Sequence, residues 1–411
     1  MSIFDVLHKI THFLADMLGN EMRRMSKMYG TAGIVAEFDP FHRGHEYLIQ
    51  QARERGASHI AVVMSGAAVQ RGSAAVCSKH ERAQMAVRCG ADLVAELPAP
   101  YSCSMAEYFA DGAVRILGKL GIDTLCFGSE TENADSIKKA AAAADVLKDS
   151  EEVRELLAQG MSYPAAVQRV MCELYGSDTA AAVSTPNSTL GVEYTRALAR
   201  NGIKARILPI KRRGSQHGGI GGEFPSGSEL REVMQSGGEI SCGVPEGCVP
   251  KVIYDPRRGD EILLYRMLTA SKEELLRLPE VNESVADRII KVRRDPPDSF
   301  EEFIMAVKTA NITHARLRRS ALHLVLGITA ADLIEPPYVR ILAFNRRGAE
   351  ILRRAEASAA VSASLRELED SSDGAAHIIA IENRAVRFQQ MCGTVSGRFE
   401  NEYTRRVRIS G

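Results

Sequence analysis

Short apolar runs alternate with longer segments of helical periodicity through the first half of the chain. Apolar or alternating runs, typical of buried strands, occupy residues 34–38, 58–65, 92–97, 123–127 and 204–211. Helical spacing occupies the segments between them, at 46–55, 78–90, 105–120, 134–148, 151–180 and 192–201. Strands that alternate with helices predict βαβ units, so we expect an α/β fold built on a parallel sheet.

The second half of the chain has few strand candidates. Successive helical patterns fall at 262–268, 272–278, 285–293, 300–309 and 314–326. Residues 339–344 are a possible strand, and residues 355–375, rich in Ala, Ser and acids, predict a loosely packed helix or a linker. We therefore expect an α/β domain at 28–245 and a mainly helical domain at 246–411.

Residues 1–27 precede the first strand and have an amphipathic helical pattern. The first turn lacks the basic residues of a secretory signal. The segment is either a dispensable N-terminal extension, or translation starts at Met22, Met25 or Met28. We assign no function to it.

Charge and cysteine content narrow the class of protein. The 411 residues balance 52 basic against 52 acidic side chains, so any surface for a polyanion must be local. The eight cysteines include no Cys-x-x-Cys pair, which argues against a zinc ribbon and is typical of reduced cytosolic thiols. No apolar run has the length of a transmembrane helix. We expect a cytoplasmic protein that binds neither membrane nor DNA, and the sequence leaves its oligomeric state open.

The strongest candidate for chemistry is the stretch from Gly33 to Leu48, where the first strand gives way to a helix. The helical pattern places His42 and His45 at the helix N-terminus. The first N–H groups of a helix lack intrahelical partners and the macrodipole is positive there, so this position suits phosphate. Gly44 would let a ligand approach the backbone without a Cβ in the way. The alternative is two ordinary turn histidines.

Other candidate segments follow later strands, where parallel sheets bind their ligands. Gly128 ends one strand. Asn187 precedes a helix and is either its N-cap or a polar contact to ligand, and the residues alone favour the cap. Residues 214–222 contain five glycines and should be mobile, either closing over a ligand or simply disordered.

Two more helix starts carry hydroxyl groups or cations. A helix begins near Pro225, with Ser226 or Ser228 as its cap and Arg231 one turn further on, which offers a second anion site. The densest basic cluster is His314-Ala-Arg-Leu-Arg-Arg319. Charge alone leaves this cluster open as a solvated helix face or a nucleic-acid contact.

With Glu37-Phe-Asp-Pro-Phe-His-Arg-Gly-His45, the chain resembles the HxGH nucleotidyltransferase superfamily, which implies a Rossmann-like domain. More narrowly it resembles the bacterial tRNA(Met) cytidine acetate ligase family, from about residue 29 to 350. The segments that carry this resemblance are Met64-Ser-Gly66, Gln70-Arg-Gly72, Ser78-Lys79, Asp92-Leu-Val-Ala-Glu-Leu-Pro98, Phe127-Gly-Ser-Glu130, Pro186-Asn187, Leu190-Gly191, Lys211-Arg212, Lys308-Thr309, Thr313, Arg316-Leu-Arg-Arg319, Pro336-Pro-Tyr338 and Phe344-Asn345.

The resemblance implies an enzyme that makes acetyl-adenylate from acetate and ATP, then acetylates N4 of the wobble cytidine in elongator tRNA(Met). His42 and His45 would act on the phosphates, with Mg²⁺ as a helper and no metal site in the protein. Residues expected to bind ATP, from the resemblance and from the helix termini, are Val35, Glu37, Phe38, Asp39, Pro40, Phe41, Gly44, Gly128, Asn187, Lys211, Arg212, Arg213, Ser226, Ser228 and Arg231. Residues expected to bind RNA are Lys308, Arg316, Arg318 and Arg319.

Some positions depart from the family pattern. Arg43 stands where the family more often has Asn, and the stretch from Lys308 to Thr313 lacks a basic-aromatic middle. Two other functions share the HxGH motif. One is a small-molecule adenylyltransferase of the pantetheine-phosphate or nicotinamide-mononucleotide kind, and the other is a nucleotide- and RNA-binding relative without catalysis.

Overall fold

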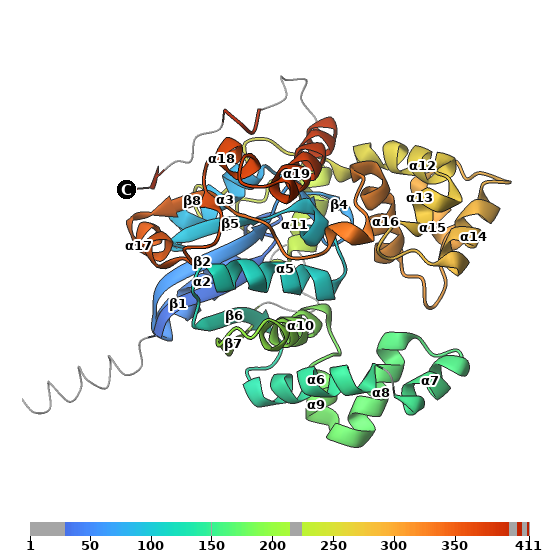
Figure 1. Ribbon diagram of the computed structural model, residues 1–411, viewed down its shortest axis with the longest axis horizontal. Coiled ribbons are helices and arrows are strands. Elements are labelled where there is room, and N and C mark those ends of the chain that lie inside the picture. The colour runs from blue at the N-terminus through green and yellow to red at the C-terminus, as the bar shows by residue number, and fades with distance from the viewer. Residues whose placement is uncertain (1–28, 149, 214–223, 394–400, 405–408, 411) are drawn as a thin grey trace, which may run out of the picture.

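The computed structural model describes residues 29–148, 150–213, 224–393, 401–404 and 409–410 (Figure 1). The predicted N-terminal extension and the glycine-rich residues 214–222 lie outside these ranges, so the expectations for them stay predictions. No helix of the described residues is long and apolar enough to cross a membrane.

A mainly parallel sheet forms the centre of the molecule, in the order β10-β8-β5-β2-β1-β6-β7 (Figure 1). Its parallel members from the first half are β1 (Tyr29–Ala36), β2 (Ala57–Ser65), β5 (Leu93–Leu97), β6 (Thr124–Ser129) and β7 (Arg206–Lys211). Ile34 pairs with Val62 of β2 and with Cys126 of β6. The predicted α/β fold with a parallel sheet is therefore confirmed.

The strand order reverses at β1, near the centre of this sheet. From β1 the chain moves in one direction to β2 and β5, and then returns to the other side of β1 for β6 and β7. Ligands of open α/β sheets bind at such a reversal, beyond the carboxyl ends of the strands. The HxGH turn follows β1 directly, at this place.

The strands are mostly apolar because both faces of the sheet are covered. On one face Ile34 and Val62 pack against helices that include α2 (Arg43–Glu54) and α3 (Lys79–Arg88). On the other face Val35 and Val63 pack against a core that includes α5 (Ala106–Lys119), α6 (Ala134–Leu147) and α10 (Pro186–Arg200). The remaining elements of the first half are β3 (Ala68–Val69), β4 (Ser73–Ala74), α4 (Ala99–Ser102), α7 (Glu151–Ala158), α8 (Tyr163–Tyr175), α9 (Ser177–Ala181) and α11 (Gly227–Gln235).

Helices of the second half, among them the five predicted ones, form a lobe beside the sheet (Figure 1). Their apolar core also includes Ala68 and Ala74. The helices are η1 (Pro256–Gly259), α12 (Asp260–Thr269), α13 (Lys272–Leu276), α14 (Glu283–Val292), α15 (Phe300–Val307), α16 (His314–Leu326) and η2 (Ala330–Asp332). The chain then returns to the sheet through β8 (Val339–Asn345), α17 (Arg346–Arg354), β9 (Val361–Ser362), α18 (Leu365–Glu369), α19 (Asp373–Met391) and β10 (Ile409–Ser410).

The last part of the chain differs from the expected division at residue 245. Strand β8 pairs antiparallel with β5, so the second half completes the sheet of the first. The apolar side chains of β8 become buried when the strand joins the sheet. A separate helical domain would not bury them in this way. Residues 355–375 also differ from the expected loose helix or linker, because they include β9, α18 and the start of α19.

Candidate nucleotide-binding site

Two histidines cap the helix that follows β1. His42 is the N-cap of α2, and its Nδ1 accepts the N–H of Gly44 at 3.1 Å. The Nδ1 of His45 accepts the N–H of His42 at 3.2 Å, which completes a capping box. The two rings stack with their centroids 3.7 Å apart. Because both Nδ1 atoms accept hydrogen bonds, the neutral rings carry their protons on Nε2, the remaining donor of each ring.

Burial keeps both histidines uncharged in the free protein. It lowers the pKa of His42 to about 3, with help from the positive charges of Arg212 and Arg231. Burial also lowers the pKa of His45 well below its ordinary value, followed by the effects of His42 and the same arginines. Neutral imidazole N–H groups at a helix N-terminus suit a polyanion. They can donate hydrogen bonds to it without first giving up a bond to a protein carboxylate.

Aromatic side chains hold His45 in place. The rings of Phe38 and Phe41 lie 4.8 and 5.7 Å from the His45 ring, measured between centroids. Both phenylalanines are buried, as are Val35 and Pro40. These four residues were expected to contact the nucleotide, and that expectation stays a prediction.

A second helix N-terminus meets the first. Ser226 caps α11 by accepting the N–H of Glu229, which decides between the two candidate caps, whereas Ser228 lies in the helix and is exposed. A Cβ placed on Gly227 would lie 3.7 Å from Nε2 of His42. Arg231 donates from Nη1 to the carbonyl of Asp39 at 2.6 Å. The structure thus brings the two predicted anion sites together around His42.

The end of β7 supplies further cations beside the end of β6. The N–H of Arg212 donates to the carbonyl of Ser129 at 3.0 Å, and its side chain passes beside Gly128, where a Cβ would lie 3.3 Å from Cγ of Arg212. Arg213 lies over the ring of Tyr47, 4.6 Å from its centroid. Lys211, Arg212 and Arg213 are all exposed, in keeping with cations that meet a ligand.

Asn187 is not an N-cap, which corrects the interpretation from the residues alone. Helix α10 begins earlier than its apolar pattern predicts, and Thr185 is its cap. The amide of Asn187 lies 3.5 Å from Oε1 of Glu130, and Ser188 donates to Oε2 of Glu130 at 2.6 Å. Burial would raise the pKa of Glu130, but hydrogen bonds from Ser188 and Thr185 lower it overall. Glu130 was not among the predicted site residues, although it orients Asn187.

The predicted RNA-binding arginines have partners inside the protein. Arg319 makes two hydrogen bonds to the Glu280 carboxylate, at 2.5 and 2.6 Å. Arg318 pairs with Asp260 at 2.7 Å, and Arg316 donates to the carbonyl of Glu280 at 2.8 Å. Lys308, by contrast, is exposed. The arginines of α16 therefore bind groups within the protein. The sequence did not predict these internal contacts.

Comparison with known proteins gives this site its class. Residues 29–402 match the model of the HIGH Nucleotidyl Transferase family. A tRNA(Met) cytidine acetate ligase of Syntrophotalea carbinolica is 34% identical over 78% of this chain and 81% of the relative. One from Streptococcus agalactiae serotype III is 36% identical over 79% of this chain and 86% of the relative. The chain belongs to this family of HIGH nucleotidyl transferases, the tRNA(Met) cytidine acetate ligases.

A solved structure agrees with that assignment. The crystal structure of Thermotoga maritima TmcAL bound with alpha-thio ATP superimposes with a TM-score of 0.79 at 27% sequence identity. The match covers 91% of this chain and 97% of the other. The resemblance noted in the sequence is therefore confirmed.

Gly44→Ala tests whether the turn depends on a missing side chain. A Cβ here would lie 2.9 Å from Cε1 and 3.0 Å from Nδ1 of His42, so the ring must move. We expect adenylate formation to fall by roughly tenfold or more, because a misplaced donor no longer meets the transition state. Acetate-dependent exchange of pyrophosphate into ATP measures the effect. The control is Gly374→Ala, where the new Cβ makes ordinary contacts at 4.0 Å; equal activity in both variants would contradict the prediction.

The low pKa of His42 predicts a pH-dependent stability of the ligand-free protein. The unfolded chain binds a proton near pH 6.5, whereas the folded chain does so only near pH 3, so stability is lost as pH falls through this window. From pH 7 to pH 5 the loss due to His42 should be about 2 kcal/mol. His42→Asn, which keeps a cap acceptor, should remove that part of the loss. Urea unfolding at both pH values tests this, and an unchanged pH dependence in the variant would refute it.

Proposed function

We propose that the protein forms acetyl-adenylate from acetate and ATP, and transfers the acetyl group to N4 of the wobble cytidine of elongator tRNA(Met). The observation that carries this proposal is the pair of neutral histidines at two converging helix N-termini, in a chain whose relatives are tRNA(Met) cytidine acetate ligases. The ATP analogue bound to the structural relative supports ATP as the ligand of this site.

In the first step a carboxylate oxygen of acetate attacks the α-phosphorus of ATP. The bond between the α-phosphorus and the bridging oxygen breaks, and pyrophosphate leaves with the electron pair. Negative charge builds on the phosphate oxygens, and the Nε2–H donors of His42 and His45, together with the positive N-terminal end of the α2 dipole, stabilise it. We propose that Arg212 and Arg231, whose charges help to lower the pKa of His42, neutralise the leaving pyrophosphate.

In the second step the N4 amine of cytidine attacks the carbonyl carbon of acetyl-adenylate. The bond to the AMP oxygen breaks, and the amine loses a proton. We assign no side chain as the base for this proton. AMP and N4-acetylcytidine are the products.

Mg²⁺ is proposed to bind together with ATP. The described residues contain no group of three or more His, Cys, Asp or Glu side chains placed to hold a metal ion. The acids nearest the site, Glu37 and Asp39, are paired with Arg71. A resident metal does not fit these residues, and Mg²⁺ would bind mainly to ATP phosphates and water, as it commonly does.

The helical lobe is the proposed contact for tRNA. Because the proposed substrate is a tRNA, the proposed location of the protein is the cytoplasm. Lys308 is the exposed member of the predicted set. Arg316, Arg318 and Arg319 retain intermediate exposure, so phosphate contact is proposed in addition to their internal bonds.

Incubation with elongator tRNA(Met), ATP and acetate tests the whole reaction. Mass analysis of the nucleosides should show N4-acetylcytidine, with AMP formed in equal amount. A dinucleotide product formed without tRNA would instead identify a small-molecule adenylyltransferase. ATP binding without either product would contradict an enzymatic role.

A further inference from the structure

Two acidic side chains border the proposed phosphate site. Glu37 and Asp39 immediately precede the histidine turn, and both carboxylates are directed to the β3–β4 hairpin. Glu37 Oε1 accepts the N–H of Gln70 at 2.6 Å, and Asp39 Oδ1 accepts the N–H of Val76 at 2.7 Å. Glu37 therefore has one oxygen bonded to the hairpin turn, and Asp39 has one bonded to the backbone just after β4.

Arg71, at the tip of this hairpin, faces the other oxygen of each acid. Its Nη2 donates to Oδ2 of Asp39 and lies 3.5 Å from Oε2 of Glu37. Burial would lower the pKa of Arg71, but the two carboxylates raise it above its ordinary value. One guanidinium thus serves two carboxylates, while its side chain stays 31% exposed.

Without Arg71 these acids would oppose ATP binding. Asp39 lies three residues before His42, and its side chain is 1% exposed, so water screens its charge little. Arg231 approaches the same segment, but it bonds the carbonyl of Asp39 and not the carboxylate. Arg71 is thus the cation that bonds both carboxylates directly, whereas the charge of Arg231 acts on them without such a bond.

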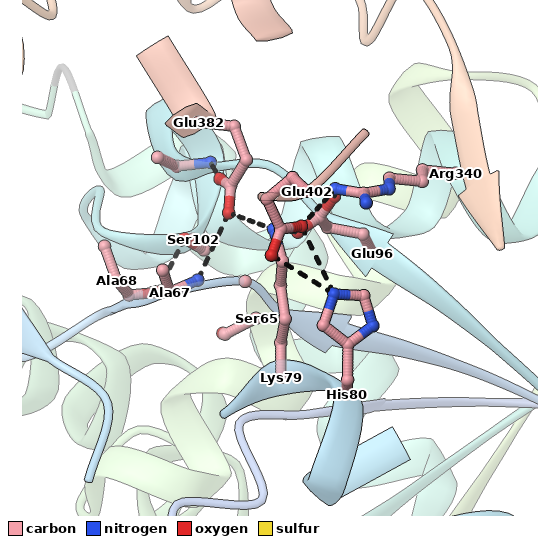
Figure 2. Close-up of polar contacts among 12 residues, drawn as sticks. Ser65, Ala67, Ala68, Lys79, His80, Glu96, Ser102, Arg340, Glu382 and Glu402 are labelled. Atoms are coloured by element: carbon pink, nitrogen blue, oxygen red, sulfur yellow. Dashed lines mark hydrogen bonds and ion pairs between the residues drawn. The ribbon is translucent and has the colours of Figure 1, made fainter. Parts of the chain in front are cut away.

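Contacts with helix α19 hold the hairpin that carries the Arg71 guanidinium. Figure 2 shows Glu382 of α19 beside Ala67 at the hairpin base and Lys79 of α3. Glu382 accepts the N–H of Ala67 at 3.2 Å, and Gln389 of the same helix donates to the carbonyl of Ala75 at 2.8 Å.

At the tip, Gly72 has φ +81°, and a Cβ there would lie 2.4 Å from the backbone nitrogen of Arg319 in α16. The hairpin is thus fixed by α19 at its base and by α16 at its tip. Its contacts explain why an arginine from outside the HxGH stretch reaches the turn.

We propose that Arg71 is a positioning residue of the nucleotide site, which neutralises Glu37 and Asp39 so that ATP phosphates meet the paired histidines without opposing charge. This inference rests on the proposed function only in taking ATP as the ligand. It also explains how acidic residues fit next to a polyphosphate site.

Binding of ATP to the full chain, in the absence of acetate and tRNA, tests the proposal. Arg71→Ala should raise the Kd by about tenfold or more, because the buried Asp39 and the partly exposed Glu37 both lose the cation that bonds them. Adding Glu37→Gln and Asp39→Asn to Arg71→Ala should restore the Kd to within roughly threefold of the wild type. Both amides keep the oxygens that accept the N–H groups of Gln70 and Val76.

Two further variants separate charge from structure. Arg71→Lys keeps the positive charge and should bind ATP better than Arg71→Ala. Arg169→Ala removes an exposed arginine paired with Glu173 on α8, far from any proposed site residue in sequence, and should bind ATP like the wild type. Thermal unfolding of each variant checks that it is folded.

The proposal is overturned if Arg71→Ala binds ATP as the wild type does, or if the triple variant binds no better than Arg71→Ala. The second result would make Arg71 a direct ligand contact or a structural residue. Failure of the proposed function looks different, since the wild type would bind ATP without acetate-dependent pyrophosphate release.

Discussion

His45→Ala should lower acetate-dependent adenylate formation by about 100-fold or more, equivalent to roughly 2.7 kcal/mol of transition-state stabilisation. The loss has two physical sources. The variant lacks the Nε2–H donor, and it also frees the N–H of His42, which the Nδ1 of His45 accepts at 3.2 Å. The His42 ring, stacked on His45, would lose its support as well. Pyrophosphate exchange into ATP measures the step without tRNA.

The matched control is His314→Ala, which removes an imidazole from the first turn of α16. His314 pairs with Glu301 at an exposed position of the helical lobe, and it is not among the proposed nucleotide-site residues. Its loss should leave adenylate formation unchanged. Full activity of His45→Ala would remove the HxGH histidines from the mechanism.

Arg319→Ala should destabilise the protein by about 3 kcal/mol, because it leaves the carboxylate of Glu280 without its partner. The two side chains are 13% and 6% exposed, and they share two hydrogen bonds. The urea midpoint of unfolding measures the change. If stability is unaltered and only tRNA binding is lost, then Arg319 serves RNA contact alone and the structural role is refuted.

Lys308→Ala is the informative companion to Arg319→Ala. Lys308 is exposed at the end of α15, so its removal should change stability little. If the helical lobe contacts tRNA phosphates there, the variant should bind tRNA more weakly, and the dependence of binding on salt should become less steep. An identical salt slope in variant and wild type would contradict that contact.

Much of the fold follows from local patterns in the chain. The apolar runs around Ile34 and Val62 predict buried strands because both faces of a covered parallel sheet exclude water. The histidine turn was predictable for a related reason, since Asp39-Pro40 ends the strand and helical spacing resumes after Gly44. Local chemistry alone determines these features.

Long-range contacts set the limit of such predictions. Nothing in residues 339–345 indicates that they pair antiparallel with β5, because strand partners depend on the whole fold. Arg71 lies 32 residues from Asp39, and no periodicity connects them. The partners of Arg318 and Arg319 were missed for the same reason. A basic run has the same sequence pattern whether its side chains face RNA or an internal carboxylate.

Asn187 shows how a local rule can mislead. A polar residue before an apolar helical pattern favours an N-cap. The helix starts six residues earlier than that pattern, with Thr185 as its cap, and this leaves the Asn187 amide beside Glu130. The family resemblance pointed to a ligand contact at this residue, which stays a prediction.

The most direct test of the central claim is the release of pyrophosphate from ATP, measured with and without acetate and with and without elongator tRNA(Met). The account predicts release that requires acetate and occurs without tRNA, since adenylate formation precedes acetyl transfer. Addition of tRNA should then yield N4-acetylcytidine and sustain turnover. Pyrophosphate release that is independent of acetate, or no release from a folded protein that binds ATP, would contradict acetate activation at the paired histidines.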